Sequence, residues 1–398
     1  MTGHLLLDLI AAAFAVLAGV GSLYTLVAVF LLRRFAGRPK PQATAFPGVS
    51  ILKPLHGAEE GLDDNLKSFC RQDYPGLVQI IFGLREPADP AAVVVRRLQA
   101  ELPGADLALV IDAKTTGANG KISNLVNMAP SIRNELLVIA DSDIRVEADY
   151  LQCLSGAIAE PGVGLVTCLY RGIAAGGLWS QLAAMGINYH FLPSVLVGLA
   201  IGRADPCFGS TMALRRETLA RIGGFEAFVN HLADDHAIGA AVRREAGRIE
   251  VPRMILGHIC REWSAGEMLR RELRWARTLR LLDPAGFFGS AVTHPLPFAL
   301  LALVLSSGSL WGVGTVVLAL FCRLLLQSQV DRVIGPIGAG SGSFWLEPIR
   351  DLLSFAVFVA SHFTDAVTWR GQRFRVNRDG TLIPADNLAH HESGPLRI

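Results

Sequence analysis

Two aspartates directly follow a continuous apolar run and could bind a divalent cation. The run extends from Leu136 to Ala140, and Asp141 and Asp143 come next, separated by one serine. An uninterrupted apolar run of this length is typical of a strand buried on both faces. Because ligands of open parallel sheets collect at the carboxyl ends of strands, the pair could hold a hard cation against a diphosphate. The alternative is an Asx-rich turn that caps a helix from about Val146.

A second acidic pair could supply a general base. Asp234 and Asp235 open a predicted helix that runs to about Arg244, and His231 and His236 lie on either side of them. Carboxylate and imidazole groups at one helix start are a plausible site for proton abstraction. Acidic residues in a first helical turn are also ordinary partners of the helix dipole, so both interpretations stay open.

Two basic segments could contact an anionic ligand. The loop from Lys114 to Lys121 contains two glycines and two lysines, a composition that suits a loop wrapped around an anionic group. It is not a P-loop, because Gly-x-x-x-x-Gly-Lys-Ser/Thr does not occur with its required strand and helix. A flexible surface loop is the alternative. Lys53 to Gly57 forms a strand-to-loop transition that could receive a nucleotide base, although a plain turn is equally consistent with it.

These segments are positioned by a regular alternation of apolar runs and helical patterns. The predicted strands are Val49–Leu52, Val78–Leu84, Leu107–Ile111, Leu136–Ala140 and Val163–Leu169, with helical stretches such as Leu62–Cys70 and Pro90–Leu102 between them. Alternation of this kind predicts βαβ units, and therefore an α/β fold with a mostly parallel sheet and helices on both faces. Asp106 and Asp112 lie at the two ends of the third predicted strand.

Composition excludes several classes of protein. Half of the 398 residues are apolar and only 18% are charged, which is too apolar for an ordinary soluble enzyme. The net charge of +2, without a basic stripe of interleaved aromatic residues, argues against binding of nucleic acid. The six cysteines are scattered, so we expect reduced core or membrane residues and no zinc site or disulfide.

The amino-terminal apolar stretch predicts a membrane anchor. It runs from Leu5 to Leu32, is long enough to span a bilayer, and is followed by Arg33, Arg34, Arg38 and Lys40. The charges follow the stretch, unlike those of a signal peptide, so we expect an uncleaved anchor. The positive-inside rule then places the chain after Arg33 in the cytoplasm.

The carboxyl-terminal part also has membrane character. Trp263 to Leu282 is predicted as a basic amphipathic helix on a membrane surface, with arginines toward lipid headgroups or a pyrophosphate. Pro295 to Gln327 is predicted as two spans joined by a turn at Ser306–Gly308, and Leu352 to Val367 as a span or a re-entrant or interfacial helix. We therefore expect an anchor (1–35), an α/β domain (46–262), an interfacial helix (263–290), a transmembrane or re-entrant region (291–370) and a polar tail (371–398).

The order of these motifs resembles that of a known enzyme family. Four motifs stand in the order found in inverting membrane glycosyltransferases with a GT-A fold. They are a Pro-Gly turn before Asp106, Asp141-Ser-Asp143, Asp234-Asp235 and Arg271-Glu-Leu-Arg274-Trp275. More narrowly, the chain resembles the ceramide glucosyltransferase family, including bacterial relatives that glycosylate hopanoids. Ile51–Leu55, Gly120–Leu125 and Asp141–Val146 are its most family-specific stretches. Arg271 stands where the family often has glutamine, which puts an amide contact there in doubt.

The resemblance implies roles for the acidic residues. Asp143, with Asp141 beside it, would hold Mg²⁺ or Mn²⁺ against the diphosphate of a UDP-sugar. Asp235 would accept the proton of the acceptor hydroxyl, with Asp234 positioning it. Asp106 would contact the uridine or ribose.

The resemblance also implies roles for the basic residues and for the acceptor. Lys53, Lys121 and Arg271 would bind the nucleotide-sugar, and Arg274 and Trp275 would close on the diphosphate and the acceptor's entrance. The acceptor would be a membrane lipid, a hopanoid or a ceramide-like alcohol, and the bacterial relatives imply an inner-membrane location. The alternatives are a processive polysaccharide synthase of the cellulose-synthase type, which usually has more spans, a nucleotidyl or phosphoryl transferase, or a nucleotide-binding membrane protein without glycosyl transfer.

Overall fold

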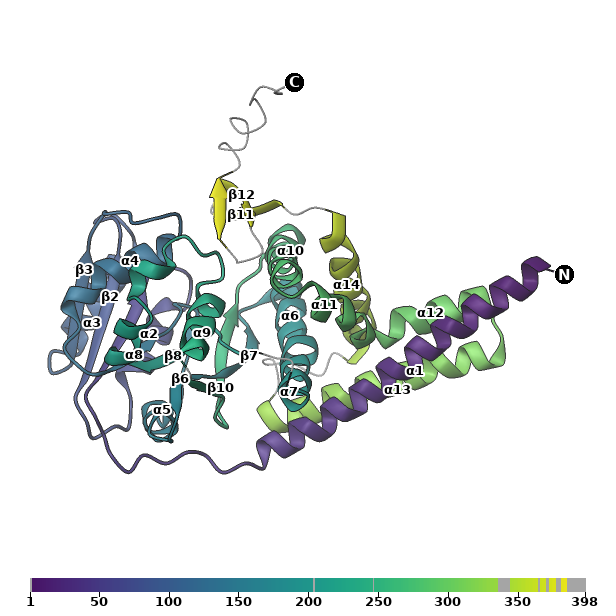
Figure 1. Cartoon of the computed structure of the whole chain (residues 1–398), viewed down its shortest axis with the longest axis horizontal. Coiled ribbons are helices and arrows are strands. Elements are labelled where there is room, and N and C mark those ends of the chain that lie inside the picture. The colour runs from purple at the N-terminus through teal and green to yellow at the C-terminus, as the bar shows by residue number, and fades with distance from the viewer. Residues whose placement is uncertain are drawn as a thin grey trace, which may run out of the picture.

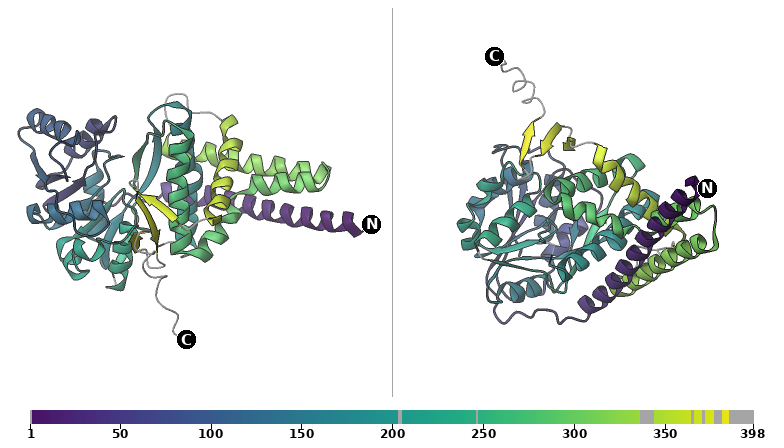
Figure 2. Two further views of the ribbon diagram at one scale, coloured as in Figure 1. Left: turned by 90° about the horizontal axis from the view of Figure 1, so that it is seen from above. Right: turned by 45° about the vertical axis from the view of Figure 1, so that its right-hand side comes forward.

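The computed structural model describes residues 2–202, 205–245, 247–335, 344–363, 366–369, 372–376 and 381–384. Along its long axis lie a sheet domain, a middle layer of helices and a projecting bundle of helices that carries the N terminus at its far end (Figure 1). The two further views show the same order (Figure 2). The molecule therefore has one part built from sheets and one part built from helices.

A seven-stranded sheet forms the centre of the sheet domain, in the order β3-β2-β1-β4-β8-β6-β9. Its strands are β1 (Val49–Pro54), β2 (Val78–Leu84), β3 (Asp106–Ile111), β4 (Leu136–Ile139), β6 (Val163–Thr167), β8 (Met212–Arg215) and β9 (Arg248–Glu250). The first four strands are parallel, β6 and β9 are parallel, and β8 runs antiparallel between β4 and β6. The predicted α/β class with a mostly parallel sheet is confirmed.

The predicted strand Val163–Leu169 is divided between two sheets. β6 ends at Thr167, and β7 (Leu169–Ala174) enters a second sheet of order β5-β10-β7. The other members of this sheet are β5 (Ile144–Arg145) and β10 (Ile255–Cys260). Because β5 follows the turn after β4, the second sheet lies beside the carboxyl ends of the parallel strands.

Side chains of the central strands alternate between two buried cores. On β4, Leu136 and Val138 belong to one core, and Leu137 and Ile139 belong to the other. The first core is covered by α2 (Leu62–Cys70), α3 (Ala91–Glu101) and α5 (Tyr150–Ile158), and the second by α4 (Gly120–Met128), α8 (Arg216–Arg221), η3 (Phe225–Phe228) and α9 (Asp234–Arg244). Burial on both faces explains why β4 is a continuous apolar run.

The middle layer joins the sheet domain to the bundle. It consists of α6 (Gly177–Gly186), the π-helical segment η2 (Ile187–Phe191), α7 (Leu192–Ala200), α10 (Ala265–Leu282), α11 (Pro284–Gly289), η4 (Ser290–Thr293), α14 (Glu347–Ala360) and η6 (Ser361–Phe363). α14 packs against α10, α12 and α6. Its 14 residues extend about 21 Å, which is less than a bilayer core, so the structure favours an interfacial helix here over a span.

One apolar helical segment was not identified from the sequence. Gly177–Ala200 has the length and hydropathy of a membrane span. It connects β7 to β8, and these strands pair with β10 and with β4 of the same sheet domain. A single crossing would separate β7 and β8 by a bilayer, so this segment cannot span it. It lies against β7 at one end and α1 at the other.

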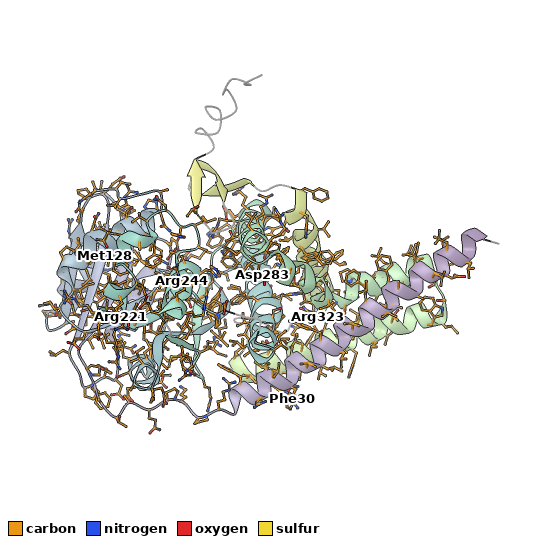
Figure 3. All side chains as sticks on the ribbon, viewed as in Figure 1. Phe30, Met128, Arg221, Arg244, Asp283 and Arg323 are labelled. Atoms are coloured by element: carbon orange, nitrogen blue, oxygen red, sulfur yellow. The ribbon has the colours of Figure 1, made fainter. Side chains whose placement is uncertain are left out.

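The bundle consists of α1 (Thr2–Ala36), α12 (Pro295–Leu305) and α13 (Leu310–Ile334), which pack against one another. The predicted apolar helices at both ends of the chain are therefore present, and α1 and α13 are each long enough to cross a membrane. α12 reaches that length only together with α11 and η4, from which it is bent by 63°. Large apolar side chains such as Phe30, marked in Figure 3, and Phe321 face outward, each 62% exposed.

The tail contains structure that its polar composition did not predict. β11 (Ala366–Trp369), β12 (Gln372–Val376) and β13 (Leu382–Pro384) form an antiparallel sheet. The alternation of polar and apolar residues in β12 is the pattern of a strand. Thr381 forms a β-bridge with His231, just before α9. The rest of the tail after Pro384 lies outside the described residues.

Candidate active site

The turn after β4 presents Asp141 and Asp143 at the carboxyl ends of the parallel strands. Lys53, near the end of β1, lies behind this turn and is 0% exposed. Its Nζ donates to the Asp141 carbonyl oxygen and lies 3.8 Å from the centre of the Phe69 ring. Burial lowers the pKa of Lys53 to about 7, against the opposing effect of Asp141. Lys53 therefore contacts the turn from inside the core, and its direct contact with the nucleotide-sugar stays a prediction.

Asp143 lies beside a histidine that the sequence did not point to. β5 pairs antiparallel with β10, so that Ile144 is the register partner of His258. The Asp143 Oδ1 atom is 3.6 Å from His258 Nδ1 and has no hydrogen-bond partner among the described residues. Burial lowers the pKa of His258, although Asp143 acts in the opposite direction. The sequence feature that could have indicated His258 is that it is a lone polar residue within the apolar strand Ile255–Cys260.

Lys121 links two of the predicted carboxylates. Its Nζ is 2.8 Å from Asp141 Oδ1 and 3.1 Å from Asp234 Oδ2. Although burial acts to lower it, these two carboxylates raise the pKa of Lys121 above its ordinary value. Asn119 fixes the start of α4 by accepting from the backbone N–H groups of Lys121 and Ile122. The loop that was predicted to bind an anion thus places an ammonium group between two acidic motifs far apart in the sequence.

Asp235 is held in place by backbone donors. Its Oδ2 accepts from the Gly209 N–H at 3.0 Å, and its Oδ1 accepts from the His236 N–H at 2.8 Å. Burial, and after it the charge of Asp234, raise the pKa of Asp235 to about 6, with Lys121 opposing. A Cβ atom on Gly209 would lie 2.8 Å from Asp141 Oδ2, so glycine allows the two acidic motifs to approach.

Helix α10 brings the last motif to the same place. Arg271 forms an ion pair with Glu262, and its guanidinium lies 4.9 Å from the centre of the Trp275 ring. The Trp275 ring is in turn 6.4 Å from that of His258, the neighbour of Asp143. Arg271 can therefore bind a nucleotide-sugar only through the guanidinium N–H groups that its ion pair with Glu262 leaves free.

Arg274 lies in the electrostatic field of the carboxylates. Burial and the neighbouring charge of Arg271 lower the pKa of Arg274, while Asp235 and Asp141 act to raise it. Ser264 caps α10 by accepting from the Glu267 N–H, which fixes the start of the helix. α10 also packs against α14 and α6, so it is a packed helix of the middle layer, and its predicted contact with a membrane surface stays a prediction.

The structure does not place Asp106 at this site. Asp106 begins β3, is the register partner of Gln79 near the amino end of β2, and pairs with Arg133 on the surface. In a parallel sheet the amino ends lie a strand's length from the site. Asp89, which follows β2, is the carboxylate at the correct edge, and it accepts from the Gly57 N–H at 3.0 Å with both oxygens. Asp106 therefore lies at the amino end of its strand, away from the other predicted site residues.

Comparison with known sequences gives one family for nearly the whole chain. The model of Glycosyl transferase family 21 matches residues 13–382. Ceramide glucosyltransferase 3 of Caenorhabditis elegans is 23% identical over 363 residues, which cover 86% of this chain and 75% of the relative. Ceramide glucosyltransferase 1 of the same organism is 22% identical, over 96% of this chain and 82% of the relative. The ceramide glucosyltransferase of Pyricularia oryzae is 21% identical, over 98% of both chains.

Comparison with solved structures shows the fold. The mannosyltransferase PcManGT from Pyrobaculum calidifontis, in complex with GDP-Man and Mn²⁺, superposes with a TM-score of 0.52 and 19% sequence identity. The superposition covers 90% of this chain and 99% of the mannosyltransferase. The expected GT-A fold with helical extensions is thereby confirmed.

Proposed function

The chain belongs to glycosyl transferase family 21 and is a glycosyltransferase, and from that premise we propose that it transfers glucose or N-acetylglucosamine from a UDP-sugar to a lipid alcohol with inversion. The acceptor is the hydroxyl of a membrane lipid, a hopanoid or a ceramide-like alcohol. Two properties support a lipid acceptor: the similar proteins are named ceramide glucosyltransferases, and apolar helices adjoin the catalytic domain.

The observation that carries this proposal is the division of the acidic residues into two environments. Asp143 has a buried carboxylate oxygen that finds no hydrogen-bond partner in the described part of the chain, beside the imidazole of His258. Asp235 has both oxygens held by backbone donors and a raised pKa. Two carboxylates whose environments differ in this way suit two different tasks, one at the donor and one at the acceptor.

The residues around Asp143 fit a divalent cation. The Asp143 Oδ1 atom, which has no hydrogen-bond partner among the described residues, and His258 Nδ1, 3.6 Å from it, are two donors that suit Mn²⁺ or Mg²⁺, with imidazole favouring Mn²⁺. Asp141, which pairs with Lys121 in this structure, would be a further ligand. When bound, such a cation would neutralise negative charge on the diphosphate of the donor. The mannosyltransferase of the same fold is described with Mn²⁺, which is consistent with this assignment.

The chain's own residues then perform the transfer. Asp235 takes the proton of the acceptor hydroxyl as its oxygen attacks the anomeric carbon, the bond from that carbon to the diphosphate breaks, and UDP leaves. Lys121 pairs with Asp234, which fixes the charge of the carboxylate next to Asp235. Arg274 faces the negative charge that develops on the leaving group, because a guanidinium suits phosphate oxygens.

The proposed function also requires that the catalytic domain lie on the side of the membrane where the UDP-sugar is found. The basic residues Arg33, Arg34, Arg38 and Lys40 directly follow the apolar part of α1, which favours a cytoplasmic catalytic domain. The resemblance to bacterial relatives is the ground for proposing a bacterial inner membrane.

Product analysis tests the proposal. Purified protein in vesicles that contain ceramide or a hopanoid alcohol would be supplied with UDP-glucose or UDP-N-acetylglucosamine and Mn²⁺, and the lipids extracted for mass spectrometry. We expect one hexose per lipid, release of UDP, and inverted anomeric configuration by NMR. Release of UMP or pyrophosphate would indicate a nucleotidyl or phosphoryl transferase, and a polymeric product would indicate a processive synthase.

A further inference from the structure

A cavity of about 370 Å³ lies in the middle layer and adjoins the proposed site, with which it shares Arg271 and Trp275. We call it the α10–α14 cavity, because residues of these two helices line it, together with residues of α11, η4 and the segment from α6 to α7. Figure 3 labels Asp283, which lines the cavity between α10 and α11, and Arg323 on α13 of the bundle. The volume is within the range of pockets that bind small organic ligands.

The side walls of the cavity are apolar or internally neutralised, apart from the Asp283 carboxylate, which accepts from the Gly286 N–H. Phe287, Val357 and Phe358 supply much of the surface. Arg350 donates from Nη1 and Nη2 to the two carboxylate oxygens of Glu272, each at 2.8 Å. Since Arg271 is likewise paired with Glu262, the walls offer no unpaired cation to a phosphate group. The walls therefore favour a neutral ligand.

One end of the cavity is polar. His190 and His294 both line it, their rings stack with centroids 5.7 Å apart, and the Nδ1 atom of each is buried without a hydrogen-bond partner among the described residues. His294 is only 6% exposed. Buried polar groups without partners are uncommon, and an entering hydroxyl or amide group would satisfy them.

These histidines are poorly suited to hold a metal ion. His190, His294 and Asp351 are close enough to one another to do so. However, Arg323 already places its Nη2 2.6 Å from His190 Nε2 and its Nε 3.3 Å from Asp351 Oδ1. A second cation beside this guanidinium would be repelled at short range. Hydrogen bonding is therefore the better use of this end.

The cavity is connected both to the chemistry and to the membrane surface. Trp275 lines it and also contacts His258, the neighbour of Asp143. Around it, Leu279, Phe288 and Phe363 are 56%, 72% and 82% exposed, an apolar surface that suits lipid and not water. A molecule could thus keep its chains in the bilayer while its head reaches Trp275.

We propose that the α10–α14 cavity binds the head and the first part of one hydrocarbon chain of the lipid acceptor, with His190 and His294 hydrogen-bonding a neutral hydroxyl- or amide-bearing head. This inference rests on the proposed function and assigns its acceptor site. It selects neutral lipid alcohols and rejects their phosphorylated forms, because each guanidinium that lines the cavity is already paired with a carboxylate.

A filled cavity provides the first test. In Thr293→Trp the new ring would occupy the cavity from η4, whereas in the control Leu301→Trp the ring would be added to the outer side of α12. Both variants would be assayed in vesicles containing ceramide and, in parallel, a hopanoid alcohol. For Thr293→Trp we expect KM for the lipid to rise about tenfold or more, because losing the burial of only two methylene groups already corresponds to about that factor. UDP affinity and hydrolysis of the donor without lipid should not change, and Leu301→Trp should behave as wild type.

Photo-crosslinking of the wild-type protein keeps the inference testable if Thr293→Trp fails to fold. A ceramide with a diazirine in its acyl chain should label peptides of α11 or α14, and ceramide should compete while ceramide 1-phosphate should not. Three results would overturn the cavity assignment if the wild type still transfers hexose to ceramide: labelling only outside α11 and α14, equal competition by ceramide 1-phosphate, or an unchanged lipid KM in Thr293→Trp. Each of them would leave the proposed function standing. Absence of transfer to either lipid by the wild type would instead overturn the proposed function.

Discussion

The environment of Asp235 permits a separation of chemistry from folding. In Asp235→Asn one acceptor oxygen is kept for a backbone donor, and the charge is removed. We expect turnover to fall on the order of 10²–10⁴-fold, the usual contribution of a general base. The melting temperature should change little, because the raised pKa shows that the buried charge itself does not favour the folded state. A loss of melting temperature that parallels the loss of activity would reduce Asp235 to a structural residue of the α9 start.

The pH dependence checks the same assignment. Burial and Asp234 raise the pKa of Asp235 to about 6, while Lys121 opposes them. The base form is therefore lost as pH falls through about 6, so kcat/KM measured at saturating Mn²⁺ should decline below that pH and level off above it. An ordinary aspartate, with a pKa of about 3.9, would keep full activity at pH 5. A flat profile down to pH 4.5 would argue against Asp235 as the base.

His258 offers a test of the metal site that does not depend on turnover. We expect His258→Ala to weaken Mn²⁺ binding, measured by electron paramagnetic resonance, by at least about tenfold, since even outer groups of metal sites contribute 10- to 100-fold. The matched variant His56→Ala removes an exposed histidine that contacts Asp89 and should leave Mn²⁺ affinity unchanged. Equal affinities in wild type and His258→Ala would remove His258 from the donor set.

At the residue scale, the sequence located the acidic residues of the site better than the residues that surround them. Asp141, Asp143, Asp234 and Asp235 all lie at the site, because acidic residues that end an apolar strand or begin a helix stand out against their surroundings. His258 was missed because its proximity to Asp143 comes from the pairing of β5 with β10, strands far apart in the sequence.

Two other predicted site residues are not exposed beside the site carboxylates, for similar reasons. Lys53 points into the core, since its strand is buried on both faces. Asp106 lies at the amino end of its strand, a matter of strand direction that spacing alone does not reveal.

At the element scale, α10 is tied to α14 by one buried ion pair. Arg350 and Glu272 have side chains 3% and 12% exposed, and Arg350 also donates to the Leu182 carbonyl oxygen and to Ser354. Glu272→Gln would leave a buried guanidinium without its counter-charge, which typically costs about 3–5 kcal/mol. We therefore expect a clear fall in melting temperature in detergent. The control Arg97→Ala breaks an exposed pair with Asp63 and should have little effect.

A double variant distinguishes charge from shape at this contact. Glu272→Leu combined with Arg350→Met removes both charges and retains apolar volume, so much of the lost stability should return. If the losses of the two single variants simply add in the double variant, the contact is not an ion pair in solution.

Helix and strand types were predictable at this scale, and their roles were not. α6 to α7 and α10 both have patterns that suggest membrane contact. The segment from α6 to α7 does not span the bilayer, because β7 pairs with β10 and β8 pairs with β4 in the same sheet domain. The position of α10 depends on partners, Glu272 with Arg350 among them, that lie 78 residues apart.

At the scale of the whole molecule, the elements define a single consistent topology. The N terminus and the turn between α12 and α13 lie at the same far end of the bundle, while the catalytic domain lies at the other (Figures 1 and 2). If α1 crosses once, with the basic residues after it inside, then α12 runs outward and α13 returns. The chain then enters α14 on the side of the catalytic domain.

This topology predicts the accessibility of two exposed positions. Leu77 on the sheet domain is 78% exposed and Leu310 at the far turn is 91% exposed, whereas five native cysteines are buried and Cys70 is half-buried. With a membrane-impermeant maleimide, Leu77→Cys should be labelled in inside-out vesicles and not in intact spheroplasts. Leu310→Cys should show the reverse, and the unsubstituted protein gives the background. Labelling of Leu77→Cys from outside would place the catalytic domain across the membrane from the cytoplasmic nucleotide-sugar pool. It would contradict the orientation and, with it, the proposed use of a UDP-sugar donor.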